Sequence, residues 1–337
     1  RRASPGVNST ISIRGPYASE KEFNQGVKKD PSRFTTKEVK EWTDVYAFPL
    51  LPPEDQAISA FGQLQESPRV SAEVEGSWNV VPYRTGITSS HLLESDDPSD
   101  AEAAAWPVYK GESFDVWNQD TESYYGWGDK DTLIEYLQDK RSRSRKWPDN
   151  DRDLPCFQPT IAFRRVTRAT DSRTIRAALI PPEVFMRDAD PVLLWERGDE
   201  MDEAYLTGVL SSIPADWYAR RFVEKHLDYY IFNGIPIPRT SDNNTLRERV
   251  VTLAGRLAAI DERYADWADE VGVTYGPLDE EEKFDKISEL DAVVAHLYGL
   301  SREHVEVIFE TFHDGWDYEE RLDRVLDYYA SWADKLD

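Results

Sequence analysis

Two acidic residues and a lysine form the one pattern in this sequence that could support metal-dependent hydrolysis. Asp30, Glu38 and Lys40 match an Asp…Glu-x-Lys arrangement, in which the carboxylates hold a metal ion and the lysine orients the attacking water. Those residues are expected on adjacent strands, whereas residues 1–33 predict irregular, strand-poor structure and residues 35–45 a short helix. A match this short also arises often by chance among 64 acidic residues. A metal-dependent nuclease subunit is therefore an alternative hypothesis.

Other catalytic constellations are absent from the sequence. There is no glycine-rich phosphate loop, no G-x-S-x-G elbow and no H-E-x-x-H motif. The double prolines at 52–53 and 181–182 lack the polar residue before them and the aromatic residue immediately after them, with which DNA adenine methyltransferases hold a flipped base. The single cysteine, Cys156, excludes a disulfide framework and is expected to be a buried apolar filler. We predict no catalytic residue, no metal ligand and no cofactor in this chain.

Positive charge is concentrated between residues 140 and 187. This segment holds twelve Lys and Arg residues against five Asp and Glu residues, a formal charge of +7 in a chain of net charge −24. Concentrated positive charge on an acidic protein favours contact with a polyanion, here nucleic acid. The alternative is a set of arginines that pair with nearby carboxylates on an ordinary solvated face.

The overall composition limits the classes of protein to which the chain can belong. The 64 acidic residues outnumber the 40 basic ones and are spread along the chain, which favours a protein adapted to concentrated salt over a generic acidic interaction protein. No apolar run approaches the roughly 18 residues of a membrane span, and no signal peptide opens the chain. We expect a soluble, cytoplasmic, halophilic protein without membrane contact. Because the sequence starts at Arg1-Arg2 without Met, we expect it to be a piece of a longer polypeptide.

The basic segment must be positioned by a few predicted elements. Residues 77–83 and the beginning of 106–114 predict strands, and residues 131–140 predict a helix whose basic end suits the helix dipole, a structural explanation for that charge. Residues 160–166 and 174–180 predict a hairpin with its turn at Asp171-Ser172. Such a hairpin would present arginines along its strands and near its tip. Residues 93–102 predict an acidic loop.

The remainder of the chain predicts mainly helices. A helix is expected over 204–213, ended by Pro214, and residues 217–232 fit either helix or strand. The proline-rich segment 233–239 marks a boundary, because proline interrupts helices. Beyond it, apolar spacing predicts helices over 246–270, 279–298, 301–312 and 317–336. We predict a mixed-sheet α/β domain over residues 1–238 and an all-helical domain over residues 239–337.

Several motifs follow one another in an order that resembles a known family. They are WPVYKGESF (106–114), IAFRRV (161–166), SRTIRAALIPP (172–182), YLTGVLSS (205–212), NGIPIP (233–238) and DAVVAHLYGLS (291–301). The first five resemble the C-terminal target-recognition region of adenine-specific DNA methyltransferases in restriction–modification, BREX and DISARM-type phage-defence systems, and the sixth resembles the helical tail of the same proteins. The proline-rich exit before a long helix also resembles type I specificity subunits. The resemblance covers residues 75–315, and residues 1–75 match less clearly.

The resemblance implies a module that recognises double-stranded DNA for a methyltransferase catalytic domain, in cis or in trans, which would carry the S-adenosylmethionine. Arginine reads guanine and Asn or Gln reads adenine, whereas other basic residues fix the register on phosphates. The predicted phosphate contacts are Arg141, Arg143, Arg145 and Lys146. The predicted base or phosphate contacts are Arg164, Arg165, Arg168, Arg173 and Arg176, with Asn118 and Gln119 as further base-reading candidates. A protein-interaction scaffold that uses the helical domain is the third hypothesis.

Overall fold

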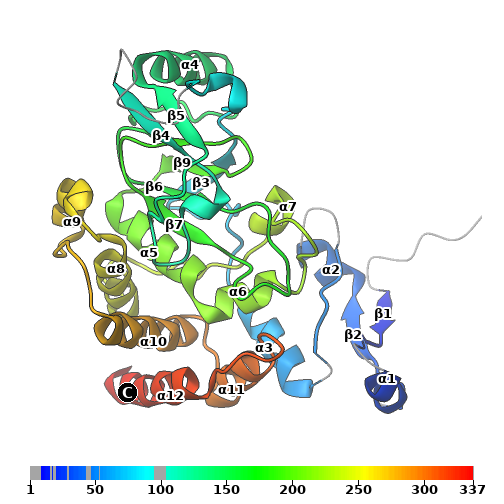
Figure 1. Ribbon diagram of the computed structural model, residues 1–337. Coiled ribbons are helices and arrows are strands. Elements are labelled where there is room, and N and C mark those ends of the chain that lie inside the picture. Colours follow the sequence, from blue (N-terminus) through cyan, green and yellow to red (C-terminus); the bar gives the residue numbers. More distant parts are fainter. Residues whose placement is uncertain are drawn as a thin grey trace, which may run out of the picture.

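The computed structural model describes residues 9–15, 17, 20–28, 30–42, 47–52, 54–94 and 104–336 of the chain (Figure 1). Its strands are β1 (Thr10–Ile13), β2 (Ser32–Thr35), β3 (Asn79–Tyr83), β4 (Ala105–Tyr109), β5 (Gly126–Asp129), β6 (Thr160–Phe163), β7 (Ala177–Ile180), β8 (Phe185–Met186) and β9 (Val192–Arg197). Its helices are α1 (Glu20–Gly26), α2 (Thr36–Trp42), α3 (Asp55–Gln65), α4 (Lys130–Arg143), α5 (Glu200–Ser211), α6 (Ile213–Ala219), α7 (Tyr229–Phe232), α8 (Thr245–Ala258), α9 (Ala265–Val271), α10 (Glu280–Leu297), α11 (Arg302–Glu310) and α12 (Glu319–Leu336). The predicted class, mixed α/β with a helical carboxyl-terminal part, is confirmed.

A four-stranded antiparallel sheet lies at the centre, with the strand order β3-β9-β6-β7. Strands β6 and β7 pair from Thr160 opposite Ile180 to Phe163 opposite Ala177, which confirms the predicted hairpin. Both strands are shorter than expected, because the ladder stops at Phe163 and resumes only at Ala177. Residues 164–176 therefore form a long connection.

The central sheet separates two apolar cores. In β6, Ile161 and Phe163 belong to the larger core, whereas Ala162 between them belongs to the smaller one. In β9, Leu193 likewise faces the larger core and Leu194 the smaller one. Successive side chains of a strand point to opposite faces, so a sheet buried on both faces needs nearly continuous apolar strands. The sequences TIAF and AALI of β6 and β7 meet this requirement.

The smaller core fills the upper part of the molecule in Figure 1, which we call the upper lobe. A three-stranded sheet of order β5-β4-β8 lies there, and α4 packs over it through the buried Leu133 and Leu137. The side chain of Asp129 accepts a hydrogen bond of 2.8 Å from the amide of Thr132 and so caps the first turn of α4. The helix predicted over 131–140 is confirmed.

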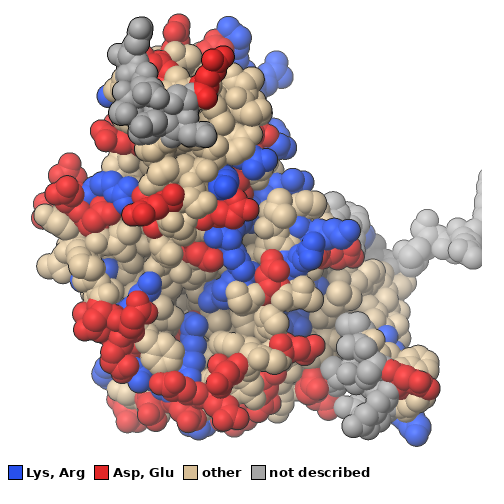
Figure 2. Space-filling model, in the orientation of Figure 1, with Lys and Arg blue, Asp and Glu red and all other residues tan. Residues whose placement is uncertain are grey.

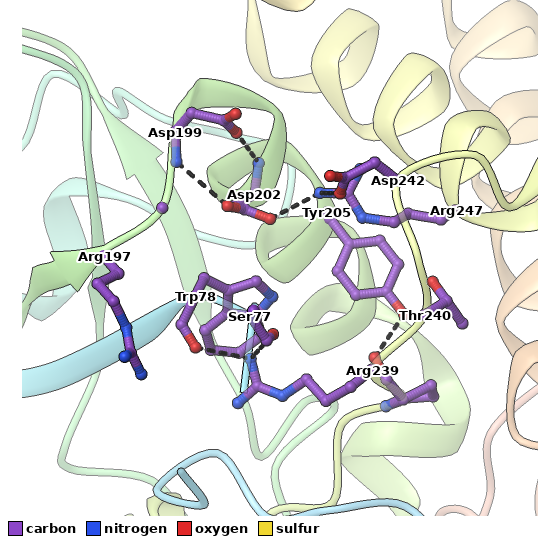
Figure 3. A pocket seen from close by; sticks show the side chains of 13 residues that line it. Ser77, Trp78, Arg197, Asp199, Asp202, Tyr205, Arg239, Thr240, Asp242 and Arg247 are labelled. Carbon is purple, nitrogen blue, oxygen red and sulfur yellow. Dashed lines mark hydrogen bonds and ion pairs between the residues drawn. The ribbon is translucent and has the colours of Figure 1, made fainter. Parts of the chain in front are cut away.

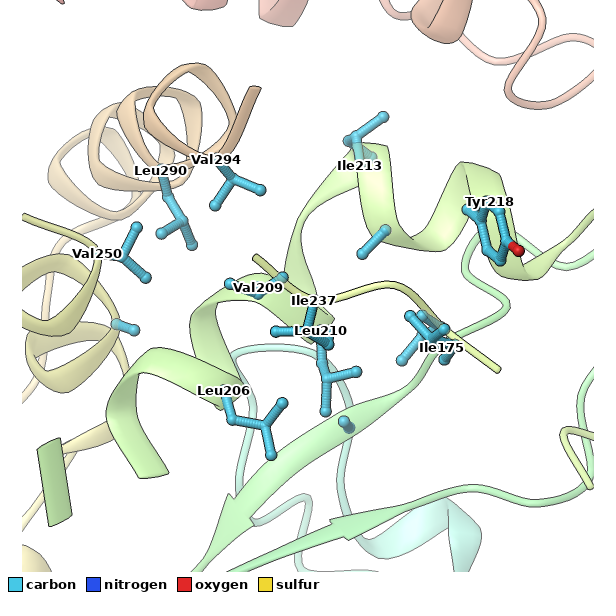
Figure 4. Close-up of a cluster of buried hydrophobic side chains, with 14 of the residues drawn as sticks. Ile175, Leu206, Val209, Leu210, Ile213, Tyr218, Ile237, Val250, Leu290 and Val294 are labelled. Carbon is cyan, nitrogen blue, oxygen red and sulfur yellow. The ribbon is translucent and has the colours of Figure 1, made fainter. Parts of the chain in front are cut away.

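The larger core joins the lower face of the central sheet to the helices. Figure 4 shows Val250 of α8 and Leu290 and Val294 of α10 grouped around the apolar side of α5. Helices α5 and α8 approach closely at Gly208, where an added Cβ would lie 2.8 Å from the side chain of Val250. Residues on both sides of Pro238 belong to this one core. The division into two domains at that point stays a prediction.

Some predicted boundaries were wrong for identifiable reasons. Helix α5 ends at Ser211, and Pro214 lies in the first turn of α6, where proline is well tolerated and where Ser212 caps the helix. The helix predicted over 246–270 is interrupted after Ala258, and the chain re-enters a helix at Ala265. Strands β1 and β2 pair within the amino-terminal segment that was expected to be strand-poor. Residues 95–102 of the predicted acidic loop lie outside the described residues.

Within the described part of the chain, every helix is too short or too polar to cross a membrane.

Candidate nucleic-acid interface

The end of α4 carries the first group of predicted contacts, residues 141–146, which we call the basic turn. Arg141 is partly buried and donates hydrogen bonds to the carbonyl oxygens of Arg152, at 2.7 Å, and Asn150. It therefore holds the loop that follows α4 in place.

The other three cations of the basic turn remain at the surface. Arg143 is 78% exposed and pairs with Asp139 one helical turn earlier, at 2.7 Å. Arg145 and Lys146 are exposed, and in the described part of the chain neither side chain forms an ion pair. An exposed i,i+4 pair contributes little energy, about 0.3–0.5 kcal/mol, so Arg143 can exchange its partner for another anion. The basic turn therefore offers three cations within four residues.

Beside the basic turn the surface is hollowed, with a volume of about 740 Å³. Arg145 and the half-exposed Phe157 line this hollow together with Trp147, Asp149 and Asp153. A cation next to an accessible aromatic ring is a pairing that nucleic-acid-binding surfaces use, since bases and sugars pack on the ring.

The second group of predicted contacts lies in the connection of residues 164–176, which we call the recognition loop. Arg164 donates to the carbonyl oxygen of Phe114 at 2.9 Å and lies 3.3 Å from the carboxylate of Asp115. Arg176 lies 3.0 Å from the same carboxylate oxygen. One aspartate thus ties both ends of the loop to the segment after β4.

Two further carboxylates hold the recognition loop from the helical side. Asp216 of α6, fully buried, accepts hydrogen bonds from Arg173 Nε at 2.7 Å and from the amides of Thr174 and Ile175. Asp228 accepts from Arg165 at 2.8 Å. These bonds fix the backbone of the loop on both sides of its tip.

Arg164, Arg165, Arg173 and Arg176 are therefore already paired within the protein. These four match the alternative explanation of the basic segment, in which arginines pair with carboxylates of the protein, and their contact with DNA stays a prediction. Arg168 differs: its side chain is exposed, and the residue is held through its backbone. Its amide donates to Asp171 Oδ2 at 3.0 Å, and its carbonyl oxygen accepts from the amide of Asp171 at 3.1 Å and from the Thr174 hydroxyl at 3.2 Å. The recognition loop thus presents Arg168 from a clamped backbone.

The two base-reading candidates after β4 differ in exposure. Asn118 is exposed and exchanges backbone hydrogen bonds with Asp115, at 2.7 and 3.0 Å, so it lies next to the carboxylate that ties Arg164 and Arg176. Gln119 is 1% exposed, and its amide donates to the carbonyl oxygen of Leu257 at 3.1 Å. The prediction that Gln119 reads bases is corrected: its side chain joins the loop to α8.

Three cations near the interface were either missed or left without a role by the sequence analysis. Arg84, after β3, pairs with Asp188, and Lys140 of α4 donates to the carbonyl oxygen of Thr85 at 2.7 Å. Lys225 is exposed, and its carbonyl oxygen accepts a hydrogen bond from the amide of Thr167 in the recognition loop. Arg84 and Lys225 lie outside residues 140–187 of the sequence, and only the fold places them near the candidate interface.

Charged side chains are unevenly distributed over the surface, although Asp and Glu side chains also lie at the top of the upper lobe (Figure 2). Figure 2 shows Lys and Arg side chains along the right-hand side of the upper lobe and across the middle of this face. Asp and Glu side chains gather over the helices at the bottom and lower left of the same view. The protein is strongly acidic as a whole, so the electrostatic repulsion of an anion is weakest where the basic side chains gather.

Two buried groups near the interface have shifted pKa values. Burial raises the pKa of Asp190 to about 6, although Arg187 and the amide of Gly111 oppose the shift. Burial likewise raises the pKa of the Cys156 thiol to about 12. The buried position of Cys156 confirms its expected role as a filler of the smaller core.

The residues of the nuclease hypothesis have ordinary positions. Glu38 and Lys40 lie on helix α2 rather than on a strand. Glu38 accepts a hydrogen bond from the amide of Thr35, at 2.5 Å, and its own amide donates to the Thr35 hydroxyl, which caps the helix. Asp30 is exposed just before β2. Among the described residues, no group of three or more His, Cys, Asp or Glu side chains is arranged to hold a metal ion.

No protein-family model matches the chain, and no curated protein matches it. Among solved structures, the chain is similar to that of MmeI, a Type IIL restriction-modification enzyme whose structure was described in complex with DNA, at 13% sequence identity and a TM-score of 0.37. The match covers 80% of this chain and 37% of that chain, so the present chain spans well under half of the length of that enzyme.

Proposed function

We propose that this chain is a recognition module for double-stranded DNA. The basic turn would grip the phosphate backbone, and the tip of the recognition loop would read base edges. The observation that carries the proposal is the basic turn itself, where Arg143, Arg145 and Lys146 are exposed within four residues and only Arg143 has a carboxylate partner in the described part of the chain. On a chain of net charge −24, such a local excess of cations favours a polyanionic partner.

The clamped recognition loop supports a reading role in addition to a gripping role. Base recognition needs side chains that are held in place before binding, because ordering a loop on binding costs free energy. Asp115, Asp216 and Asp228 fix the loop through its own arginines, and this leaves Arg168 free at the surface. A single arginine can bind the O6 and N7 atoms of guanine bidentately in the major groove. Asn118, beside Asp115, is the second candidate reader.

In this proposal a catalytic domain outside this chain carries out the reaction. The motif resemblance suggests an adenine-specific N6-methyltransferase catalytic domain, joined to this chain or associated with it, that would bind S-adenosylmethionine. The present chain would supply the choice of DNA sequence, for methylation alone or together with restriction. Its acidic remainder would keep nonspecific attraction to DNA low, so that specific contacts decide binding.

The salt dependence of duplex binding tests the proposal. A protein that neutralises phosphates releases counterions, and the logarithm of the binding constant falls with the logarithm of salt concentration by about 0.9 per phosphate contact. We expect wild-type protein to bind a mixed-sequence duplex, and the variant Arg143→Gln/Arg145→Gln/Lys146→Gln to bind more weakly, with a slope lower by roughly two to three. Fluorescence anisotropy over a range of KCl concentrations measures both quantities.

A control with the same change in net charge separates local contact from general electrostatics. Arg302, Lys286 and Lys335 lie on the carboxyl-terminal helices, and Arg302 forms an i,i+4 pair with Glu306 that matches the pair of Arg143 with Asp139. The triple change of these residues to Gln is expected to leave the slope unaltered. Equal slopes for the two triple variants, or no duplex binding by wild-type protein at any salt concentration, would contradict the proposal.

A further inference from the structure

A second cavity lies where three chain segments meet: the residues that enter β3, the turn from β9 into α5, and the proline-rich link into α8. Its volume is about 360 Å³, within the range of about 300–1,000 Å³ that small-molecule sites occupy. Three arginines (Arg197, Arg239 and Arg247) and three aspartates (Asp199, Asp202 and Asp242) line it, and Trp78 forms one wall. Figure 3 shows the side chain of Arg239 extending from the link towards Trp78 and towards the side on which Arg197 lies.

Most charges of this cavity already have partners. Arg247 lies 2.6 Å from a carboxylate oxygen of Asp202 and 3.4 Å from one of Asp242. Asp199 caps α5 by accepting a hydrogen bond from the amide of Asp202 at 2.9 Å. Arg197 pairs with Glu73 at 3.0 Å, but both side chains are more than half exposed. That last pair is weak and can be exchanged.

Arg239 is the exception. Its guanidinium lies 3.1 Å over the ring of Trp78 and donates only to uncharged acceptors, the carbonyl oxygens of Val70 and Trp78 at 3.1 and 3.4 Å and the Ser77 hydroxyl at 3.5 Å. Its Nε–H group is buried without an acceptor, and within the described residues no carboxylate pairs with it. Burial lowers the pKa of Arg239 to about 10, so it stays protonated at neutral pH.

A half-buried cation without a counter-charge is costly, and in proteins such groups usually pair with a carboxylate or an anionic ligand. Guanidinium groups match carboxylate and phosphate oxygens in geometry and charge. The two terminal nitrogens of Arg239 carry four N–H groups and have three acceptors, so one N–H group remains for an anion.

We propose that this cavity binds a phosphate-class anion through Arg239, with Arg197 contributing from the rim. The anion is either a free phosphate ester or a backbone phosphate of bound DNA. Arg152, which follows the basic turn in the chain, donates to the carbonyl oxygen of Gly198 in the cavity wall, so the loop after the basic turn adjoins the cavity. The anion site does not require a bound duplex. A negative result for anion binding would therefore not contradict the proposed DNA binding, and a negative result for DNA binding would not contradict the anion site.

Titration of the full chain with inorganic pyrophosphate by isothermal calorimetry tests the site. We expect saturable binding with one site per chain, and binding at least about tenfold weaker in Arg239→Gln, as for the loss of a hydrogen-bonded charged group. Arg256→Gln is the matched control, because in the described part of the chain Arg256 likewise donates only to uncharged acceptors, the carbonyl oxygens of Gly276 and Pro277, and lies outside this cavity. The control should bind pyrophosphate as wild-type protein does.

Two further arms complete the test. Arg197→Gln removes an exposed side chain without disturbing the core, so a several-fold loss in this variant supports the site even if Arg239→Gln unfolds. A short duplex that displaces pyrophosphate identifies a backbone phosphate as the ligand, whereas a duplex that does not displace it identifies a free phosphate ester; either result supports the anion site. Absence of saturable pyrophosphate binding, or equal weakening in Arg239→Gln and Arg256→Gln, overturns the proposal.

Discussion

Nε of Arg173 lies 2.7 Å from Oδ2 of Asp216, whose carboxylate is completely buried in the first turn of α6. The same carboxylate accepts the backbone amides of Thr174 and Ile175 and lies 3.4 Å from Nη2 of Arg220. One aspartate thus joins the recognition loop to the helical part of the molecule. Arg173, which was predicted to contact DNA, therefore fixes the shape of the recognition loop. That loop presents Arg168 at the surface.

Replacement of Asp216 should release this junction. Removing one partner of a buried ion pair leaves the other charge uncompensated, so Asp216→Ala is expected to lower the free energy of unfolding by about 3–5 kcal/mol. Urea denaturation measures this loss. Trypsin provides a second readout, because cleavage after Arg173 should accelerate strongly once the loop is no longer held. Asp242→Ala, at a 90% exposed carboxylate, should change stability by less than about 0.5 kcal/mol. Similar losses in the two variants would be inconsistent with the clamp.

Arg168 should govern which sequence is bound rather than how strongly DNA is bound in general. Arg168→Ala removes the exposed guanidinium at the tip of the recognition loop, and a bidentate contact with guanine is worth about 1–3 kcal/mol of discrimination. Selection from a randomised duplex pool, followed by sequencing, should show relaxed preference at one or two positions. The basic-turn variant should weaken all duplexes alike and keep the preference. A selected sequence identical in wild type and Arg168→Ala would remove this residue from the account.

Glu203 should make the protein less stable as pH rises. It is buried on α5, where Trp267 Nε1 donates to it at 3.1 Å and Arg152 lies 3.9 Å away. Burial raises its pKa to about 8, although Arg152 opposes the shift. In the unfolded chain the carboxyl group titrates near its ordinary value of about 4.3, so between pH 4.3 and 8 the folded state binds more protons and stability falls with rising pH.

Glu203→Gln removes that titration. The variant is expected to be more stable than wild-type protein at pH 8, by on the order of 2 kcal/mol after allowance for the lost attraction to Arg152, and to show little difference near pH 4. Thermal unfolding at several pH values gives the comparison. A variant that is less stable than wild-type protein at pH 8 would show that the ion pair outweighs burial at this position.

Gly86 should resist substitution. Its φ angle is +80°, a conformation that side chains rarely adopt, and an added Cβ would lie 2.3 Å from Lys140 Nζ and 2.5 Å from the Tyr136 hydroxyl. Gly86→Ala is therefore expected to lower the free energy of unfolding by about 1–3 kcal/mol. Gly62, inside α3, has open space around its Cβ position, so Gly62→Ala should instead raise stability by about 0.5–1 kcal/mol. Guanidinium denaturation of both variants checks the opposite signs.

The sequence predicted the helices and strands better than the long-range contacts of their side chains. The strands β6 and β7 and the helix α4 have short-range apolar patterns, so local spacing was sufficient to predict them. The carboxylates that pair with Arg165 and Arg173 lie 63 and 43 residues further along the chain, and no local pattern identifies them. The amide of Gln119 reaches a carbonyl 138 residues away. Exposure of a charged side chain therefore depends on tertiary packing, which neither composition nor spacing predicts.

Site-specific photo-crosslinking tests the central claim most directly. A benzoylphenylalanine placed at Arg145 in the basic turn, or at the exposed Thr170 at the tip of the recognition loop, should crosslink to a bound duplex. The same probe at Lys335 on α12, in the acidic helical part, should not. Crosslinks from 145 and 170 but not from 335 are the predicted result. Crosslinks from 335 alone, or none from either predicted position under conditions where the duplex is bound, would contradict the account.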